Sequence, residues 1–220
     1  MILSAISSFL PAIHLSFPYP LPFSFLFIFS ASSNREQILI AACCPKEVNL
    51  YGGTFRAKIP ESMKDVSEMR QVPNHQEFYA DLQSGLSTIV EMNEHQKQVK
   101  DEAAAAFFFE NLAKDNDAKA ATISKQGSAD IPSFKEYFTA YAIGDHLVKE
   151  RIDNKGPQLR VRVHMAVIRL KKVTTDLLMI LSYPVKNEIS EKESTKLEST
   201  FMAMMKSFEI RSWAVFKGSG

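Results

Sequence analysis

The sequence predicts an α+β fold: an α/β/α sandwich with a central, mostly antiparallel twisted β-sheet flanked by helices on both faces. Segments typical of strands follow one another along the chain with few helices between them, which favours antiparallel pairing. Residues 176–185 include consecutive apolar side chains, as expected for a central strand that is covered on both sides. Two segments with helical spacing, residues 99–114 and 190–208, are available to cover the sheet.

Residues 1–45 differ in composition from the rest and are predicted to be a disordered or targeting-like hydrophobic N-terminal extension. The first charged residue is Arg35, and the longest apolar run without proline is residues 23–31. This run is well short of the roughly 20 residues that span a bilayer. Its length suits the hydrophobic region of a signal peptide, but no Lys or Arg precedes it. A cleaved targeting sequence and a plain extension both stay open, and residues 46–220 are predicted to form a single domain.

The first half of the predicted domain consists of strands and turns. Residues 48–59 alternate apolar and polar side chains around Gly52 and Gly53, which predicts one bent or bulged strand. Residues 61–70 have the composition of a short helix or turn, which Asp65 or Ser67 would cap. A turn at residues 72–75 and strands at residues 76–80 and 86–93 are expected to follow.

The second half supplies both helices and the longest strands. Residues 99–114 combine high helix propensity with an apolar face, whereas residues 115–133 are small and polar, as in a loop. Alternate side chains of residues 158–171 are apolar throughout, so one face of this strand is predicted to be buried along its length. Ser190 and Glu193 form a capping box that begins the C-terminal helix. The remaining elements are a strand at residues 137–151, a turn at 153–157 and the central strand at 176–185.

No pattern in the sequence is typical of a metal, nucleotide or catalytic site. The two cysteines, Cys43 and Cys44, are adjacent, which suits neither a spaced disulfide framework nor a tetrahedral zinc site. The five histidines are scattered singly, and the common phosphate-binding, nucleophile and metalloprotease motifs are absent. Glu91 and Glu94 lie three residues apart on a predicted strand, so they should point apart rather than form an acid–base pair. We therefore expect no metal, no cofactor and no catalytic activity.

The charges are distributed unevenly, although the formal net charge is only +1. Residues 61–102 carry a net charge of −5, and residues 151–172 carry a net charge of +6. An acidic surface of this kind steers and orients a basic partner, while a few buried anchors supply the affinity. The basic stretch lacks the interleaved aromatic residues of a single-stranded nucleic-acid site. The charge distribution therefore favours a protein-binding module.

Several segments resemble the Ran guanine nucleotide release factors, the Mog family, across about residues 46–216. The most specific match is the segment DVSEMRQVPNHQE at residues 65–77. Shorter matching segments are LYGGTF at 50–55, IP at 59–60, IVE at 89–91, VHMAVIRL at 163–170 and TDLL at 175–178. The resemblance implies a central antiparallel sheet between helices, a fold shared with the extrinsic oxygen-evolving protein of photosystem II.

The resemblance also implies a function, namely binding the small GTPase Ran, loosening its bound guanine nucleotide and supporting nuclear protein import. Family members engage the GTPase through an acidic surface and are soluble nuclear and cytosolic proteins. We expect a monomer that forms a one-to-one complex with Ran. The positions expected to bind the partner are Asp65 and Glu91, with Gln76, Glu77 and Glu94 nearby and Arg70 pairing with a neighbouring carboxylate. The positions expected to be structural are Tyr51, Gly52, Gly53 and Pro73.

Two departures from the family pattern bear on these expectations. Asn74 stands where the family usually has Asp, which removes one charge from the expected interface. The N-terminal extension is the second departure, because family members lack a leader. If residues 1–45 were a transit peptide, the domain would instead be a thylakoid-lumen relative of the photosystem II protein. An enzyme of the same fold is a further alternative, which a pocket with convergent polar groups would favour.

Overall fold

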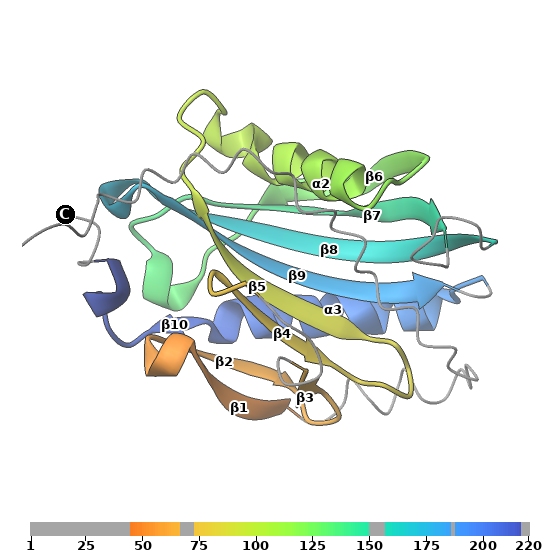
Figure 1. The fold of residues 1–220 in the computed structure, drawn as a ribbon, viewed down its shortest axis with the longest axis horizontal. Helices are drawn as coiled ribbons and strands as arrows, with labels where there is room; N and C mark the ends of the chain where they lie inside the picture. Colours follow the sequence, from red (N-terminus) through yellow and green to blue (C-terminus); the bar gives the residue numbers. More distant parts are fainter. Residues whose placement is uncertain (1–44, 67–72, 150–156, 186–187, 217–220) are drawn as a thin grey trace, which may run out of the picture.

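Seven antiparallel strands form the main sheet, in the order β3-β4-β5-β9-β8-β7-β6 (Figure 1). The computed structural model describes residues 45–66, 73–149, 157–185 and 188–216. Neighbouring strands pair antiparallel at every step of this order. The strands are β3 (Lys64–Asp65), β4 (Gln76–Ala80), β5 (Ser87–Glu94), β9 (Thr175–Val185), β8 (Gln158–Leu170), β7 (Thr139–Lys149) and β6 (Ala120–Ser128).

A second, three-stranded sheet lies beside the main one, where the sequence predicts a single bent strand. β1 (Pro45–Leu50) and β2 (Phe55–Pro60) form an antiparallel hairpin, and β10 (Glu209–Ile210) pairs with β2. The prediction of one strand over residues 48–59 is wrong because the 3-10 turn η1 (Tyr51–Gly53) reverses the chain. Tyr51, Gly52 and Gly53 have φ angles of 50°, 62° and 90°, which glycine adopts without strain. Alternation continues across the turn, so periodicity alone does not reveal it.

Among the described residues, one helix covers each face of the main sheet, which confirms the predicted fold class. α2 (Ala104–Asp115), preceded by the turn η3 (Asp101–Ala103), lies on one face (Figure 1). α3 (Glu191–Ser207) lies on the other face and also contacts the small sheet. Ser190 and Glu193 form the predicted capping box at the start of α3. None of the described helices has the length and hydrophobicity needed to cross a membrane.

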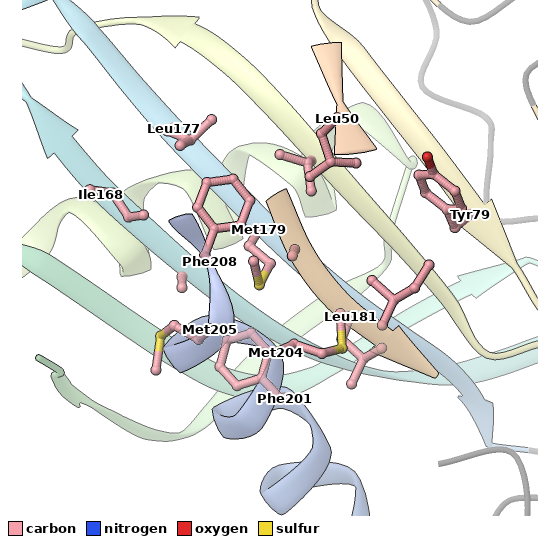
Figure 2. Packing of buried hydrophobic residues seen from close by; sticks show 14 of the residues in the cluster. Leu50, Tyr79, Ile168, Leu177, Met179, Leu181, Phe201, Met204, Met205 and Phe208 are labelled. Atoms are coloured by element: carbon pink, nitrogen blue, oxygen red, sulfur yellow. The ribbon is translucent and has the colours of Figure 1, made fainter. Parts of the chain in front are cut away.

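The two faces of the sheet bury separate hydrophobic clusters, and β8 contributes to both. Val161, Val163 and Val167 pack with α2, whereas Ile168 and Leu170 pack with α3. Alternate residues of a strand point to opposite faces, so the predicted pattern of this strand is confirmed. Figure 2 shows Ile168, Leu177, Met179 and Leu181 of the sheet near Phe201, Met204 and Met205 of α3 and the following Phe208.

Residues 115–133 contain a strand that the sequence does not predict. β6 is an edge strand whose side chains are almost all exposed, so it lacks the apolar alternation that identifies other strands. It pairs with β7 and shifts register between Ile123 and Lys125. Gly144 of β7 permits this approach, because a Cβ there would lie 2.1 Å from the carbonyl oxygen of Thr122. The neighbouring predicted turn at 153–157 falls almost entirely outside the described residues.

Candidate functional site: acidic residues on strands β3 to β5

Five of the six residues expected to bind a partner lie on three neighbouring strands at one side of the main sheet. Asp65 ends β3, Gln76 and Glu77 begin β4, and Glu91 and Glu94 lie in the second half of β5. Arg70 lies outside the described residues. Residues 61–66 form a turn and β3 rather than the start of a helix, and residues 67–70 are not described. Asn74 lies exposed in the turn before β4.

The strand register places these residues on both faces of the sheet rather than in one patch. Gln76 is paired with Glu91, so both side chains lie on the face that α2 covers. Glu77 is paired with Val90, which belongs to the cluster on the α3 face. Glu94 follows Glu91 by three residues and lies on the opposite face, as the spacing predicts.

Glu91 is the most buried carboxylate of the group, with only 7% of its surface exposed. Burial raises the pKa of its carboxyl group, and Asp115 at the end of α2 raises it further. The side-chain amides of Gln76 and Asn93 partly oppose this shift. His75 is also close, with its Nε2 3.6 Å from Oε1 of Glu91. Glu91 is therefore held in a setting that disfavours its charged form unless a cation approaches.

The hydrogen-bonding capacity around Glu91 is incompletely used. Nε2 of Gln76 is buried and has no hydrogen-bond partner of normal geometry in the described part of the chain, although it is near enough to affect the pKa of Glu91. Unsatisfied buried polar groups are costly, so they mark positions where a partner can add stabilising contacts. The amide of Gln76 and the carboxylate of Glu91 thus lie side by side on one face of the sheet.

Glu77 is held on the other face by the backbone of the turn η1. The Tyr51 backbone N–H donates a hydrogen bond to Oε1 of Glu77 at 2.5 Å, and the Tyr79 hydroxyl donates to Oε2 at 3.4 Å. Burial raises the pKa of Glu77, Asp65 adds to the shift, and both hydrogen bonds oppose it. Glu77 therefore has a structural partner of its own, whereas Asp65 at the edge is exposed.

Tyr51 connects the small sheet to the strands that carry these acidic residues. Its hydroxyl lies 2.8 Å from the carbonyl oxygens of both His75, which directly precedes β4, and Val90, in the middle of β5. The positive φ angles of residues 51–53 direct the side chain toward these strands. A separate turn precedes β4. There, the backbone N–H of Gln76 donates a hydrogen bond to the carbonyl of Pro73 at 2.9 Å.

A buried ion pair behind the end of β5 is a feature that the sequence analysis missed. Arg169 and Asp176 are at most 1% exposed, and Nη1 of Arg169 lies 2.9 Å from Oδ2 of Asp176. Nδ1 of His95 lies 2.8 Å from the other oxygen of Asp176. Arg169 also donates to the backbone carbonyls of Gln96 and Val99. The pair therefore fixes the loop that follows Glu94. In the sequence, the sign of such a buried ion pair is a charged residue within each of two otherwise apolar strands.

Most cations in the described part of the basic stretch, residues 157–172, are paired within the chain. Arg162 forms an ion pair with Asp145, and Arg169 is buried against Asp176. The remaining ion pairs of the described part of this stretch are Arg169 with Asp101, Lys171 with Asp101 and Lys172 with Glu136.

The arrangement suits binding of a cation or guanidinium group better than a chemical reaction. A desolvated carboxylate attracts a positive side chain strongly because little water screens the interaction. Over residues 45–66, 73–149, 157–185 and 188–216, no group of three or more His, Cys, Asp or Glu side chains could hold a metal ion. A carboxylate in the setting of Glu91 is a suitable partner for a basic side chain.

Comparisons with known sequences point to one family. A model of the family described as "Ran-interacting Mog1 protein" matches residues 48–184. The Ran guanine nucleotide release factor of Danio rerio is 32% identical, over 76% of this chain and 97% of its own. The nuclear import protein mog1 of Schizosaccharomyces pombe is 30% identical, over 68% of this chain and 82% of its own.

A solved structure shows the same fold. The crystal structure of the Saccharomyces cerevisiae Ran-binding protein Mog1p matches with a TM-score of 0.62. The match covers 79% of this chain and 98% of that one, at 22% sequence identity. At this level of identity, the likeness establishes the fold alone.

Proposed function

Because the chain belongs to the Mog1 family of Ran-interacting proteins, we propose that it binds the GTPase Ran, promotes release of its guanine nucleotide and supports nuclear protein import. The names of the Danio rerio and Schizosaccharomyces pombe relatives support both parts of this function. None of these relatives is a photosystem protein, so the thylakoid alternative has no support among them.

The observation that carries the proposal is the desolvated carboxylate of Glu91. Its exposed fraction is 7%, its pKa is raised by burial, and the side-chain amide of Gln76 lies beside it. A Lys or Arg side chain of Ran that approached Glu91 would stabilise its charged form. Such a pair contributes to affinity because one partner is already desolvated before binding. Glu77 and Glu94 lie on the other face of the sheet and would add to the negative field that orients Ran, as would Asp65 on the edge strand. Arg70 would hold the adjoining segment.

Nucleotide release follows from binding by thermodynamic linkage and needs no covalent step. If the chain binds nucleotide-free Ran more tightly than nucleotide-bound Ran, it must lower the affinity of Ran for nucleotide by the same factor. A carboxylate can also compete with phosphate for a Lys side chain or Mg²⁺ of the GTPase. We therefore propose a regulator rather than a catalyst.

Replacing Glu91 by glutamine is expected to weaken binding to nucleotide-free Ran by roughly ten- to hundredfold. The substitution removes the charge and keeps the shape. Because the fold disfavours the charged form of Glu91, the free energy of unfolding should not fall. Isothermal titration calorimetry with the full chain measures the affinity, and urea denaturation measures the stability.

Glu198→Gln is the matched control, because it removes the same charge from α3, on the opposite face of the sheet. The exposed ion pair between Glu198 and Lys125 contributes little to stability. The affinity of the Glu198→Gln variant for Ran should equal that of the wild type. Equal affinities of the wild type and Glu91→Gln would contradict the assignment of Glu91.

We propose that residues 46–220 are the recognition domain, because the contacts described above lie between Pro45 and Phe216. A monomer in a one-to-one complex with Ran is the expected assembly, which light scattering of the complex would test. A nuclear and cytoplasmic distribution follows from a role in import, and the relatives named as nuclear import proteins support it.

A further inference from the structure

A row of aromatic side chains lies at the end of the molecule that carries the C-terminal segment. We call Tyr137, Trp213, Phe216, Phe55 and Tyr51 the aromatic row. Successive ring centroids lie 5.9, 5.7, 6.0 and 5.8 Å apart, which are favourable distances for aromatic pairs. Figure 1 shows that the short turns at residues 51–53, 132–134 and 214–216 gather at this end.

Part of this row reaches the surface. Phe55 is fully buried, whereas Tyr137, Trp213 and Phe216 are only partly buried. Val215, between Trp213 and Phe216, is 37% exposed. Among the described residues only Val215 and Leu82 are exposed large hydrophobic side chains, and Leu82 lies in the β4–β5 turn. The C-terminal segment therefore presents an apolar surface that continues the core outward.

The backbone holds these side chains in place without help from a partner. The backbone N–H groups of Arg211 and Ser212 both donate to the carbonyl of Thr54, at 2.8 and 3.2 Å. The Ala214 N–H donates to the Ser212 hydroxyl, and the Phe216 N–H donates to the carbonyl of Trp213. A surface fixed in this way loses little conformational entropy on binding, which favours affinity.

Both ends of the aromatic row adjoin the strands of the acidic site. At one end, the Tyr51 hydroxyl donates to the carbonyl of Val90 on β5, and the Tyr51 backbone N–H donates to Glu77 on β4. At the other end is Tyr137. The ammonium of Lys172, which belongs to the turn η5 (Lys171–Val173), lies 5.6 Å from the centroid of its ring. This turn leads directly into Thr175, which is paired with Glu94. The row therefore adjoins Glu77 and Glu94, the acidic residues on the face of the sheet opposite Glu91.

We infer that the exposed part of the aromatic row, Tyr137, Trp213, Val215 and Phe216, is the apolar anchor of the interface with Ran. This inference rests on the proposed function. Interfaces combine a few rigid aromatic anchors, which supply most of the affinity, with polar or charged residues around them. The acidic residues of β3 to β5 supply charge, but they bury little apolar area by themselves. The aromatic row supplies that area on a preorganised segment next to them.

Val215→Asp is expected to weaken the complex of the full chain with nucleotide-free Ran about tenfold or more, because it places a charge in the apolar anchor. Leu82→Asp is the matched control, since Leu82 is also 37% exposed and lies in the β4–β5 turn. Its affinity should equal that of the wild type. Both positions are at the surface, so neither substitution removes a core side chain.

A second measurement uses the wild-type chain and needs no substitution. Trp213 is the only tryptophan of the chain, so incorporating 5-fluorotryptophan gives a single ¹⁹F resonance. We expect this resonance to shift or broaden when unlabelled Ran is added.

The outcomes separate this inference from the proposed function. A complex in which the ¹⁹F resonance is unchanged, or equal affinities of Val215→Asp and Leu82→Asp, would overturn the aromatic anchor and leave Ran binding intact. Absence of any complex between the wild-type chain and Ran would overturn both. A shifted resonance together with selective loss of affinity in Val215→Asp supports the anchor.

Discussion

Replacing Asp176 by alanine is expected to lower the free energy of unfolding by about 3–5 kcal/mol. The substitution leaves the Arg169 guanidinium buried at 1% exposure without its closest carboxylate, which lies 2.9 Å away. It also removes the acceptor for His95 and for the backbone N–H of Gln96. Asp101 lies 3.4 Å from Nε of Arg169 and offers only partial compensation. Urea denaturation at pH 7 measures the loss.

Glu136→Ala is the control for this prediction. Glu136 forms an ion pair with Lys172 in which both side chains are at least 70% exposed, so its loss should not change stability measurably. Replacing Arg169 and Asp176 together by methionine and leucine should recover most of the lost stability, because no buried charge is left unpaired. If Asp176→Ala unfolded at the same urea concentration as Glu136→Ala, the buried pair would not stabilise the fold as described.

Acidification is expected to destabilise the protein through two buried histidines. Burial lowers the pKa of His146 and of His164 to about 4, from 6.5. As the pH falls, the two imidazoles are therefore protonated in the unfolded chain before they are protonated in the folded protein. The part of the free energy of unfolding that they contribute above pH 6.5 is lost progressively as the pH falls toward 4. Each histidine should remove about 2 kcal/mol between pH 7.5 and pH 5. Urea denaturation at a series of pH values measures this dependence.

A variant with His146→Gln and His164→Gln isolates the contribution of the two histidines. Glu77 and Glu91 have raised pKa values, so their protonation in the folded state increases stability as the pH falls and opposes the histidines. The carboxylates are present in both proteins, so the difference between wild type and variant reports the histidines alone. An identical pH dependence for the two proteins would show that these histidines do not control acid stability.

Strand alternation predicted much of the main sheet because one or both faces of each strand are buried. β5, β8 and β9 follow this rule, and the central position of β9 confirms the prediction from its consecutive apolar residues. β6 does not follow it, because an exposed edge strand is stabilised by backbone pairing with β7 and not by apolar side chains. The hairpin of β1 and β2 was missed because the reversal depends on three successive positive φ angles, which composition does not specify.

The candidate site was predicted as a set of residues, but its geometry was not. The resemblance gave Glu77, Glu91 and Glu94, whereas the division of these residues between two faces depends on strand register. Burial of Glu91 depends on α2, whose last residue, Asp115, lies near it. The contacts of Glu77 depend on Tyr51, 26 residues earlier in the chain. Contacts between segments far apart in sequence require the fold, so residue types alone could not supply them.

Release of a fluorescent guanine nucleotide from purified Ran tests the central claim most directly. The account predicts that the full chain accelerates release, that the rate increases with its concentration until Ran is saturated, and that Glu91→Gln shifts this dependence to higher concentrations. Glu198→Gln should behave as the wild type. An unchanged release rate at concentrations where calorimetry shows a complex with Ran would contradict the claim that binding loosens the nucleotide.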